Sequence, residues 1–526
     1  MIRNTVRLAA FVVAASIGSA QTPGMWEYVG TPGLSAGTGL CAQIALDPGD
    51  VPYISYQDAT VLGGKASVQC FQAGAWSYVG AQGSASVGIA WYNRLAFDSS
   101  GAPVLACRDY GVGGRISVRK YSPALGVWNS VGPSGASPDE AHYTQLAVGA
   151  NDRIFAIYAD RGTVPADRGS AMVFDPLIQR WTFVGPRGFT NNGAGYENIA
   201  VDSQGNVYCG YADADYPDPY GNGKASVMRY NAQGAHWQFV GQPGFTQLGG
   251  LNLILSFDRH DMPYIAYLQY HQRIVVEKFD GLNWVQVGGS ASGTDRPILD
   301  TEGWRQWLSL AFDSQDQPYV AYQLYDYGDK AAVRRFDGSA WQLVGANGFT
   351  TAAADYMALA LGKNDVPYVV FRDGANAGRL SVMRYAPTPS SYCSPLANSQ
   401  GCSSTIATLG QPSTSNGMFV ISASNVLNQK SGMLLYGYAP DALPFHGGTL
   451  CLQSPIKRTP IQFSGGTQGA DDCSGSYAID FNALAQSGND PLLVPGTFVF
   501  AQYWYRDPGS PGLIGLSDAV RFSLGP

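Results

Sequence analysis

The chain has 526 residues and a formal net charge of -7. Only 13% of its residues are charged, so it offers no basic face for a nucleic acid. Its length exceeds what one ordinary core supports, which predicts several domains or one large closed repeat array. The composition, with Gly 65, Tyr 31 and Trp 11, is typical of a β protein rich in turns and aromatic strands.

Residues 1–20 have the pattern of a secretory signal peptide. Arg3 and Arg7 precede the apolar run 8–17, and small residues follow. No later segment has the roughly 18 consecutive apolar residues that a membrane helix needs. We therefore predict a secreted or cell-surface protein that is cleaved near Ala20 and has no membrane span.

A five-residue pattern, Trp-x-x-Val-Gly, occurs seven times, and its tryptophans are 47 to 57 residues apart. That period is typical of a propeller or a solenoid. Between tryptophans lie two short apolar segments around a turn, then a third segment that alternates polar and apolar residues. Four strands per unit predict the blade of a β-propeller, with each tryptophan packed between blades. The tryptophans are Trp26, Trp76, Trp128, Trp181, Trp237, Trp284 and Trp341.

The two ends of the repeat array are complementary. The last repeat ends near Tyr385 without a tryptophan strand, and Trp26 has no three-strand set before it. We predict an all-β fold in which the N-terminal strand closes a seven-bladed β-propeller over 21–387, so that no blade keeps an unpaired edge. Residues 388–391 are predicted to be a linker and 392–526 a small β-sandwich-like module.

Eight cysteines divide into two groups. Cys393, Cys402, Cys451 and Cys473 form an even set near the C-terminus, which predicts a disulfide framework in an exported chain. Four cysteines allow three connectivities, and we favour Cys393 with Cys402 and Cys451 with Cys473. The other four lie in the repeats, and we expect them to be buried small apolar residues, or to form one adventitious bridge, rather than to be metal ligands. These are Cys41, Cys70, Cys107 and Cys209.

The C-terminal quarter carries a further pattern. It has Tyr-Cys at 392–393, Gly-Cys at 401–402 and Gln-Tyr-Trp-Tyr-Arg-Asp-Pro at 502–508, and it ends Leu-Ser-Asp-Ala-Val-Arg-Phe at 516–522. This pattern resembles a terminal module that recurs behind unrelated repeat arrays in secreted proteins of environmental bacteria. The resemblance implies export and either attachment or sorting at the cell surface. It points to no particular activity. The repeat itself is similar to loosely defined secreted bacterial propeller repeats.

One position in each repeat is predicted to ring the mouth of the central channel. It lies three residues before the first strand's leading apolar residue, on the face that carries the loops between blades, where binding sites are common. Five of its seven occupants are aromatic, and they either pack into a collar that closes the channel or form a stacking platform for a sugar or another ring. The seven are Cys41, Tyr92, Tyr143, Tyr196, Asn252, Trp307 and Tyr356.

The connection into the sixth blade is the second candidate. It brings together Asp300, Glu302, Trp304, Arg305 and Trp307. Aromatic faces can meet the C–H faces of a sugar while carboxylates and Arg hold its hydroxyls, so this segment is a candidate carbohydrate site. The alternative is a loop that buries its tryptophans.

The fourth repeat contains an acidic loop with Asp213, Asp215 and Asp218. Oxygen-rich loops can bind calcium, but this spacing is not that of an EF-hand, and a solvated loop is favoured. We therefore expect no cofactor, with calcium as the weaker alternative.

Common catalytic motifs are absent from the sequence, including His-Glu-x-x-His and Gly-x-Ser-x-Gly. We predict an exported binding protein that recognises a polysaccharide or cell-surface glycan through its loop face. One alternative is a polysaccharide lyase or glycoside hydrolase that uses His142, His271 and acidic loop residues. Another is a structural or adhesive protein that binds other surface proteins. The sequence leaves open whether the protein is catalytic.

Overall fold

The computed structural model describes residues 24–59, 63–269, 273–288, 307–324, 327–415, 417–494 and 497–525. These residues form two compact units, Tyr28–Arg384 and Tyr385–Pro526, and the described residues 24–27 belong to the second. The predicted signal peptide, residues 1–20, lies outside the described part of the chain. Among the described helices, none is long and apolar enough to cross a membrane.

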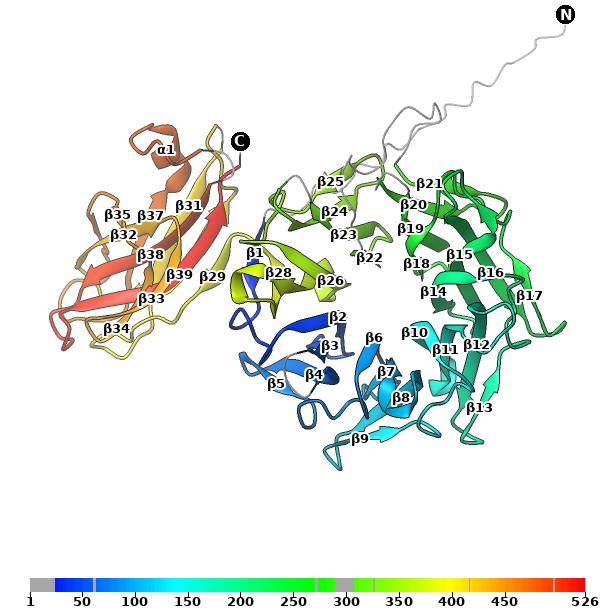
Figure 1. Cartoon of the computed structure of the whole chain (residues 1–526). Coiled ribbons are helices and arrows are strands. Elements are labelled where there is room, and N and C mark those ends of the chain that lie inside the picture. The colour runs from blue at the N-terminus through cyan, green and yellow to red at the C-terminus, as the bar shows by residue number, and fades with distance from the viewer. Residues whose placement is uncertain are drawn as a thin grey trace, which may run out of the picture. The chain divides into compact units, whose positions relative to one another are not determined.

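The first unit, together with residues 24–27 and 385–387, forms four-stranded antiparallel sheets, which Figure 1 shows side by side around a common centre with the first strand of each innermost. We number the sheets 1 to 7 along the chain. Sheet 1 contains β2 (Gly39–Leu46), β3 (Pro52–Asp58), β4 (Lys65–Gln72) and β5 (Ala75–Tyr78). Sheet 2 contains β6 (Ala90–Phe97), β7 (Pro103–Asp109), β8 (Arg115–Ser122) and β9 (Val127–Ser130). Sheet 3 contains β10 (Ala141–Val148), β11 (Ile154–Asp160), β12 (Arg168–Asp175) and β13 (Arg180–Phe183).

Sheets 4 to 6 repeat this order. Sheet 4 contains β14 (Ala194–Val201), β15 (Val207–Pro217), β16 (Gly223–Asn231) and β17 (His236–Phe239). Sheet 5 contains β18 (Leu251–Phe257), β19 (Pro263–Gln269), β20 (Arg273–Phe279) and β21 (Trp284–Gln286). Sheet 6 contains β22 (Leu308–Phe312), β23 (Pro318–Leu324), β24 (Lys330–Phe336) and β25 (Trp341–Leu343).

Sheet 7 combines both ends of the repeat array. It contains β26 (Ala354–Leu361), β27 (Pro367–Asp373) and β28 (Arg379–Pro387), and its fourth strand is β1 (Gly24–Tyr28). Just after β1, the backbone N–H of Val29 donates to the carbonyl of Val382 at 2.8 Å. Between sheets 7 and 1, an apolar core includes Ile44, Tyr56 and Val370.

The Trp-x-x-Val-Gly motif connects neighbouring sheets. The indole N–H of a tryptophan donates to the carbonyl of the valine in the preceding copy, for example from Trp181 to Val131 at 2.8 Å. The glycine that follows this valine, Gly132, has a φ of +72°, and a Cβ there would lie 2.8 Å from the Trp181 ring. Glycine is therefore required both for the left-handed backbone and for close packing. The same bond joins Trp76 to Val29, Trp128 to Val79, Trp237 to Val184, Trp284 to Val240 and Trp341 to Val287.

A second connection joins the turns that follow the first strands. An aspartate with positive φ accepts a backbone N–H from the corresponding turn of the preceding sheet, as Asp365 does from Ser314 at 2.6 Å. We call this the turn link. Sheets 7 and 1 are joined in the same way, because Lys363 donates to Asp50 at 2.8 Å. The remaining turn links are Ser99 to Asp152, Ser203 to Asp261 and Arg259 to Asp316.

The second unit is also built of strands and contains one short helix, α1 (Phe481–Gln486). One sheet has the order β29 (Ser390–Tyr392), β39 (Ile514–Ser523), β38 (Phe498–Arg506), β32 (Ser431–Gly437) and β35 (Lys457–Arg458), and β36 (Gln462–Phe463) also pairs with β32. The other has β30 (Thr405–Gly410), β31 (Phe419–Val426) and β37 (Gly475–Asp480), and β33 (Pro440–Phe445) pairs with β34 (Gly448–Leu452). The core draws on both sheets, with Ile421 and Tyr477 from one and Leu434 and Tyr503 from the other.

Two sequence predictions for this unit are wrong in detail. All four cysteines form disulfides, but the pairs are Cys393–Cys451 and Cys402–Cys473. The prediction paired cysteines that are close in the sequence, whereas the observed disulfides join segments that are distant in the sequence. The hydroxyl of Tyr392, next to Cys393, donates to the Cys451 carbonyl at 2.7 Å. The predicted linker 388–391 is also not a separate segment, since its last two residues belong to β29, which pairs with β39.

Candidate functional site

The predicted ring position has an unusual backbone. Six of its seven residues have a positive φ, between 47° and 56°, and each lies where the pairing of the first strand with the second shifts register. A β-bulge of this kind re-aims a side chain. For a tyrosine the left-handed conformation costs about 1–3 kcal/mol, and such strain persists where the surrounding structure enforces it. The six are Cys41, Tyr92, Tyr143, Tyr196, Asn252 and Tyr356, and the seventh, Trp307, immediately precedes β22.

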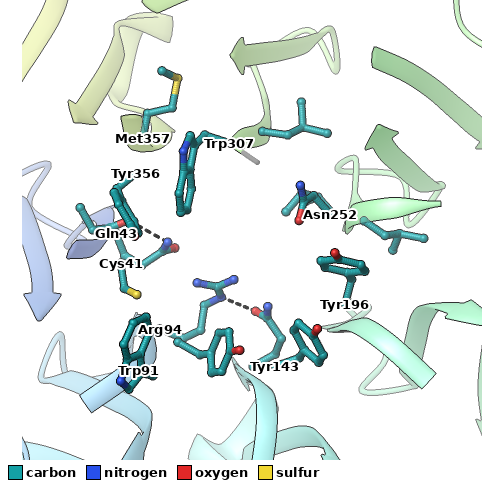
Figure 2. A pocket seen from close by; sticks show the side chains of 16 residues that line it. Cys41, Gln43, Trp91, Arg94, Tyr143, Tyr196, Asn252, Trp307, Tyr356 and Met357 are labelled. Carbon is teal, nitrogen blue, oxygen red and sulfur yellow. Dashed lines mark hydrogen bonds between the residues drawn. The ribbon is translucent and has the colours of Figure 1, made fainter. Parts of the chain in front are cut away.

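All seven ring residues line one cavity of about 370 Å³, which Figure 2 shows from close by. This volume lies in the range of small-ligand sites. The ring residues therefore surround a space instead of packing into a plug. We call this space the ring cavity.

Aromatic side chains form two arcs of the ring. The ring centroid of Tyr143 lies 5.4 Å from that of Tyr92 and 5.1 Å from that of Tyr196. Across the cavity, Trp307 and Tyr356 are in contact, with centroids 3.9 Å apart. Burial raises the pKa of Tyr143 to about 12, so its hydroxyl is neutral at neutral pH and can both donate and accept a hydrogen bond.

Sequence reasoning missed the most polar group in the cavity, Arg94. Its side chain reaches into the ring in Figure 2, where its Nε–H donates to the Oε1 of Gln145. Its Nη1 donates to the backbone carbonyl of Asn93 at 2.9 Å. Burial lowers the pKa of Arg94 to about 10, which still leaves the guanidinium charged at neutral pH. An in-register comparison of the repeats could have found it, because Gln43 and Gln145 occupy the same position, two residues after the ring residue.

The wall that faces Arg94 is apolar. Figure 2 shows Met357 and Trp307 on that side, and the cavity lining also includes the apolar residues Leu253, Ile254 and Leu308. The ring cavity thus combines polar donors and acceptors on one side with apolar and aromatic surface on the other. Such a division suits a ligand that has both a polar edge and an apolar face.

Several predicted site residues lie outside the described part of the chain, namely Asp300, Glu302, Trp304, Arg305 and His271. Their roles remain predictions. His142 is described and lies beside the ring without lining the cavity, with its Nε2 3.9 Å from the Oε1 of Glu140. Burial, and then the charge of Arg108, lower its pKa, so the imidazole is mostly neutral at neutral pH.

The acidic loop forms the end of the β15–β16 hairpin. Asp213 is buried and accepts a hydrogen bond from the Ser226 hydroxyl at 2.7 Å. Asp218 caps the hairpin turn by accepting the backbone N–H of Asn222 at 2.8 Å, while Asp215 interacts with Asn192. In the part of the chain that the structure describes, no group of three or more His, Cys, Asp or Glu side chains is placed to hold a metal.

No protein-family model matches the chain. No curated protein matches it in sequence. Among solved structures, it is similar to a polysaccharide lyase described as an ulvan lyase, with 12% identity and a TM-score of 0.45 over 68% of this chain and 95% of that one. It is also similar to the lectin of Aleuria aurantia in complex with Fucalpha1-6GlcNAc, with 14% identity and a TM-score of 0.37 over 60% of this chain and 97% of that one. A third similar structure is YCF48 from Cyanidioschyzon merolae, with 11% identity and a TM-score of 0.41 over 69% of this chain and 99% of that one.

Proposed function

We propose that this protein is an exported glycan-binding protein and that the ring cavity holds one sugar residue of its ligand. The observation that carries the proposal is the ring itself. Tyrosines with a left-handed backbone recur at the same position of several repeats, and all of them line one cavity. The same tyrosines would have no backbone strain in a regular β-strand. Repeated strain that does not fill the core is expected where a binding surface is held in place.

The chemistry of the cavity suits a sugar. Trp307 packs against Tyr356 on one side, and its remaining aromatic surface in the cavity lining can pack against the C–H face of a pyranose ring. The hydroxyls of Tyr143 and Tyr196 and the amide of Gln43 provide neutral groups that both donate and accept hydrogen bonds, which matches the hydroxyls of a sugar.

The proposed scaffold is a seven-bladed propeller closed by β1. Sheets 1 to 7 would be its blades, and the ring cavity would be the mouth of its central channel. Three features support this. They are the pairing of β1 with β28, the Trp–Val bonds between consecutive sheets, and the turn link from Lys363 to Asp50, which joins sheet 7 to sheet 1 as other links join consecutive sheets.

Export is part of the same proposal. Two disulfides favour an oxidising compartment, which is where the predicted signal peptide would send the chain. Expression with and without residues 1–20 in a secreting host, followed by N-terminal sequencing of the exported protein, tests it. Cleavage near Ala20 is expected, whereas retention of the full-length chain in the cell would contradict export.

Binding is tested with an array of polysaccharides and oligosaccharides, followed by calorimetry on the hits. Tyr196→Ala and Trp307→Ala should each weaken binding by about 10- to 100-fold, because each removes a stacking surface or a hydroxyl from the cavity. Tyr327→Ala, at an exposed tyrosine that does not line the cavity, is the matched control and should bind as the wild type does. No bound saccharide, or unchanged binding by the cavity variants, would refute the proposed site. The appearance of unsaturated products from uronate polymers would instead reveal a lyase.

A further inference from the structure

We propose that the ring cavity selects a sugar that carries an anionic group, a carboxylate or a sulfate, and that Arg94 is the residue that binds this group. This inference deepens the proposed glycan binding and rests on it. It starts from the position of one charged side chain in an otherwise uncharged lining.

Arg94 is the only charged side chain that lines the cavity in the described part of the chain. Its two hydrogen bonds go to uncharged partners, the Gln145 amide and the Asn93 carbonyl. Among the described residues no carboxylate forms an ion pair with it. A charge that is largely removed from water and paired only with neutral groups is costly, and it persists where a ligand of opposite charge completes the site.

The hydrogen-bond pattern leaves part of the guanidinium directed at the cavity. Gln145 holds Nε and Asn93 holds Nη1, so the side chain is fixed on the ring wall while Nη2 has no partner among the described residues. Figure 2 shows the guanidinium pointing toward the middle of the ring. A guanidinium fork suits the paired oxygens of a carboxylate or a sulfate better than a single hydroxyl.

One buried carboxyl follows a ring residue in the chain without lining the cavity. Glu197 follows the ring residue Tyr196, is fully buried, and has no hydrogen-bond partner for either side-chain oxygen among the described residues. Burial raises the pKa of Glu197 well above its ordinary value, which favours the neutral form of this carboxyl. Because no carboxyl side chain of the described residues lines the ring cavity, none there offsets the positive charge of Arg94.

The remaining lining fixes how the ligand would lie. The anionic group would face Arg94 and Gln145, and the sugar's apolar face would lie against Trp307 on the opposite wall. A free inorganic anion would use only the first of these contacts. An acidic monosaccharide would use both, and so it should bind more tightly than either a neutral sugar or inorganic sulfate.

The test is calorimetry with four probes: methyl glucuronide, glucose 6-sulfate, methyl glucoside and inorganic sulfate. Wild-type protein should prefer an acidic sugar to methyl glucoside by about 10- to 100-fold, the range of a charge-assisted hydrogen bond. Which acidic probe binds better decides between carboxylate and sulfate. Arg94→Gln should lose this preference while keeping the weaker binding of methyl glucoside, and Arg94→Lys should keep only part of it because the fork is lost.

Arg153→Gln is the matched control, since Arg153 is exposed, lies outside the ring cavity and should leave the preference unchanged. Arg94→Met gives a second variant without the buried charge, and its thermal melting should equal or exceed that of the wild type. An equal affinity of the wild type for methyl glucuronide, glucose 6-sulfate and methyl glucoside would overturn this inference and leave glycan binding intact. So would an acidic preference that survives Arg94→Gln. Failure of every sugar probe to bind would overturn the proposed function and this inference together.

Discussion

Two sets of aromatic residues recur through the repeats, and the structure uses them differently. The tryptophans of the Trp-x-x-Val-Gly motif lie in strands, and from Trp76 to Trp341 each indole N–H donates to the preceding sheet. The ring residues sit at left-handed bulges and leave a cavity between them. A repeated residue whose packing and hydrogen bonds are complete serves the scaffold. A repeated residue held in strain beside an open space is a candidate for binding.

The largest effect is expected from breaking the first set. Trp181→Ala removes a buried side chain and the indole bond to Val131, so the free energy of unfolding should fall by about 3–5 kcal/mol. Chemical denaturation followed by intrinsic fluorescence measures it. A loss no larger than that of a ring variant such as Tyr143→Ala would erase the distinction between the two sets.

The glycine of the motif provides a sharper comparison. Gly132 and Gly126 both have a positive φ, but a Cβ would collide with the Trp181 ring at Gly132 and meets nothing within 4 Å at Gly126. Gly132→Ala should therefore cost about 2–4 kcal/mol, combining backbone strain with overpacking, and Gly126→Ala only about 1 kcal/mol. Equal losses in denaturant titrations would mean that the close approach of the tryptophan contributes nothing to stability.

The ring should show the opposite balance. Tyr143→Gly relieves the left-handed strain while it removes a partly buried side chain, so the free energy of unfolding should change by no more than about 1 kcal/mol. Glycan affinity should nevertheless fall by about 10-fold or more, because the tyrosine supplies a hydroxyl and part of the aromatic wall. Paired calorimetry and denaturation on the same sample give both quantities. Strong destabilisation with unchanged binding would place Tyr143 in the scaffold.

The sequence predicted the features that repeat. Counting the Trp-x-x-Val-Gly copies was sufficient to expect four-stranded units, and aligning the repeats grouped Tyr92, Tyr143 and Tyr196, which line one cavity in the structure. Both inferences use only the period of the pattern and the fact that equivalent positions occupy equivalent places in a repeat array.

The features that escaped prediction depend on single residues and distant contacts. Arg94 occupies a position at which two other repeats have Gln43 and Gln145, so the repeat indicates a polar position there but not a charged one. The disulfide pairs join segments 58 and 71 residues apart, and only the fold brings them together. The left-handed backbone at Tyr143 has no sequence signal either, since tyrosine is usually excluded from that conformation.

The turn links allow a test in which a new hydrogen bond is added between two neighbouring sheets. At the turn position where the other sheets have the acceptor aspartate, sheet 4 has Gly205 and sheet 2 has Gly101. Both glycines have the positive φ that the acceptor aspartates share. Gly205→Asp should create a link, because the residue that would donate is Ala150, which has a backbone N–H, and a Cβ at Gly205 meets nothing within 4 Å. We expect a gain of about 0.5 kcal/mol in the free energy of unfolding, since aspartate tolerates the left-handed region and the new bond is exposed. Gly101→Asp is the control, because its donor position is Pro48, which has no N–H to give, and it should be neutral or destabilising. If both substitutions changed stability alike, the links would be a consequence of neighbouring sheets lying together and would contribute nothing to holding them there.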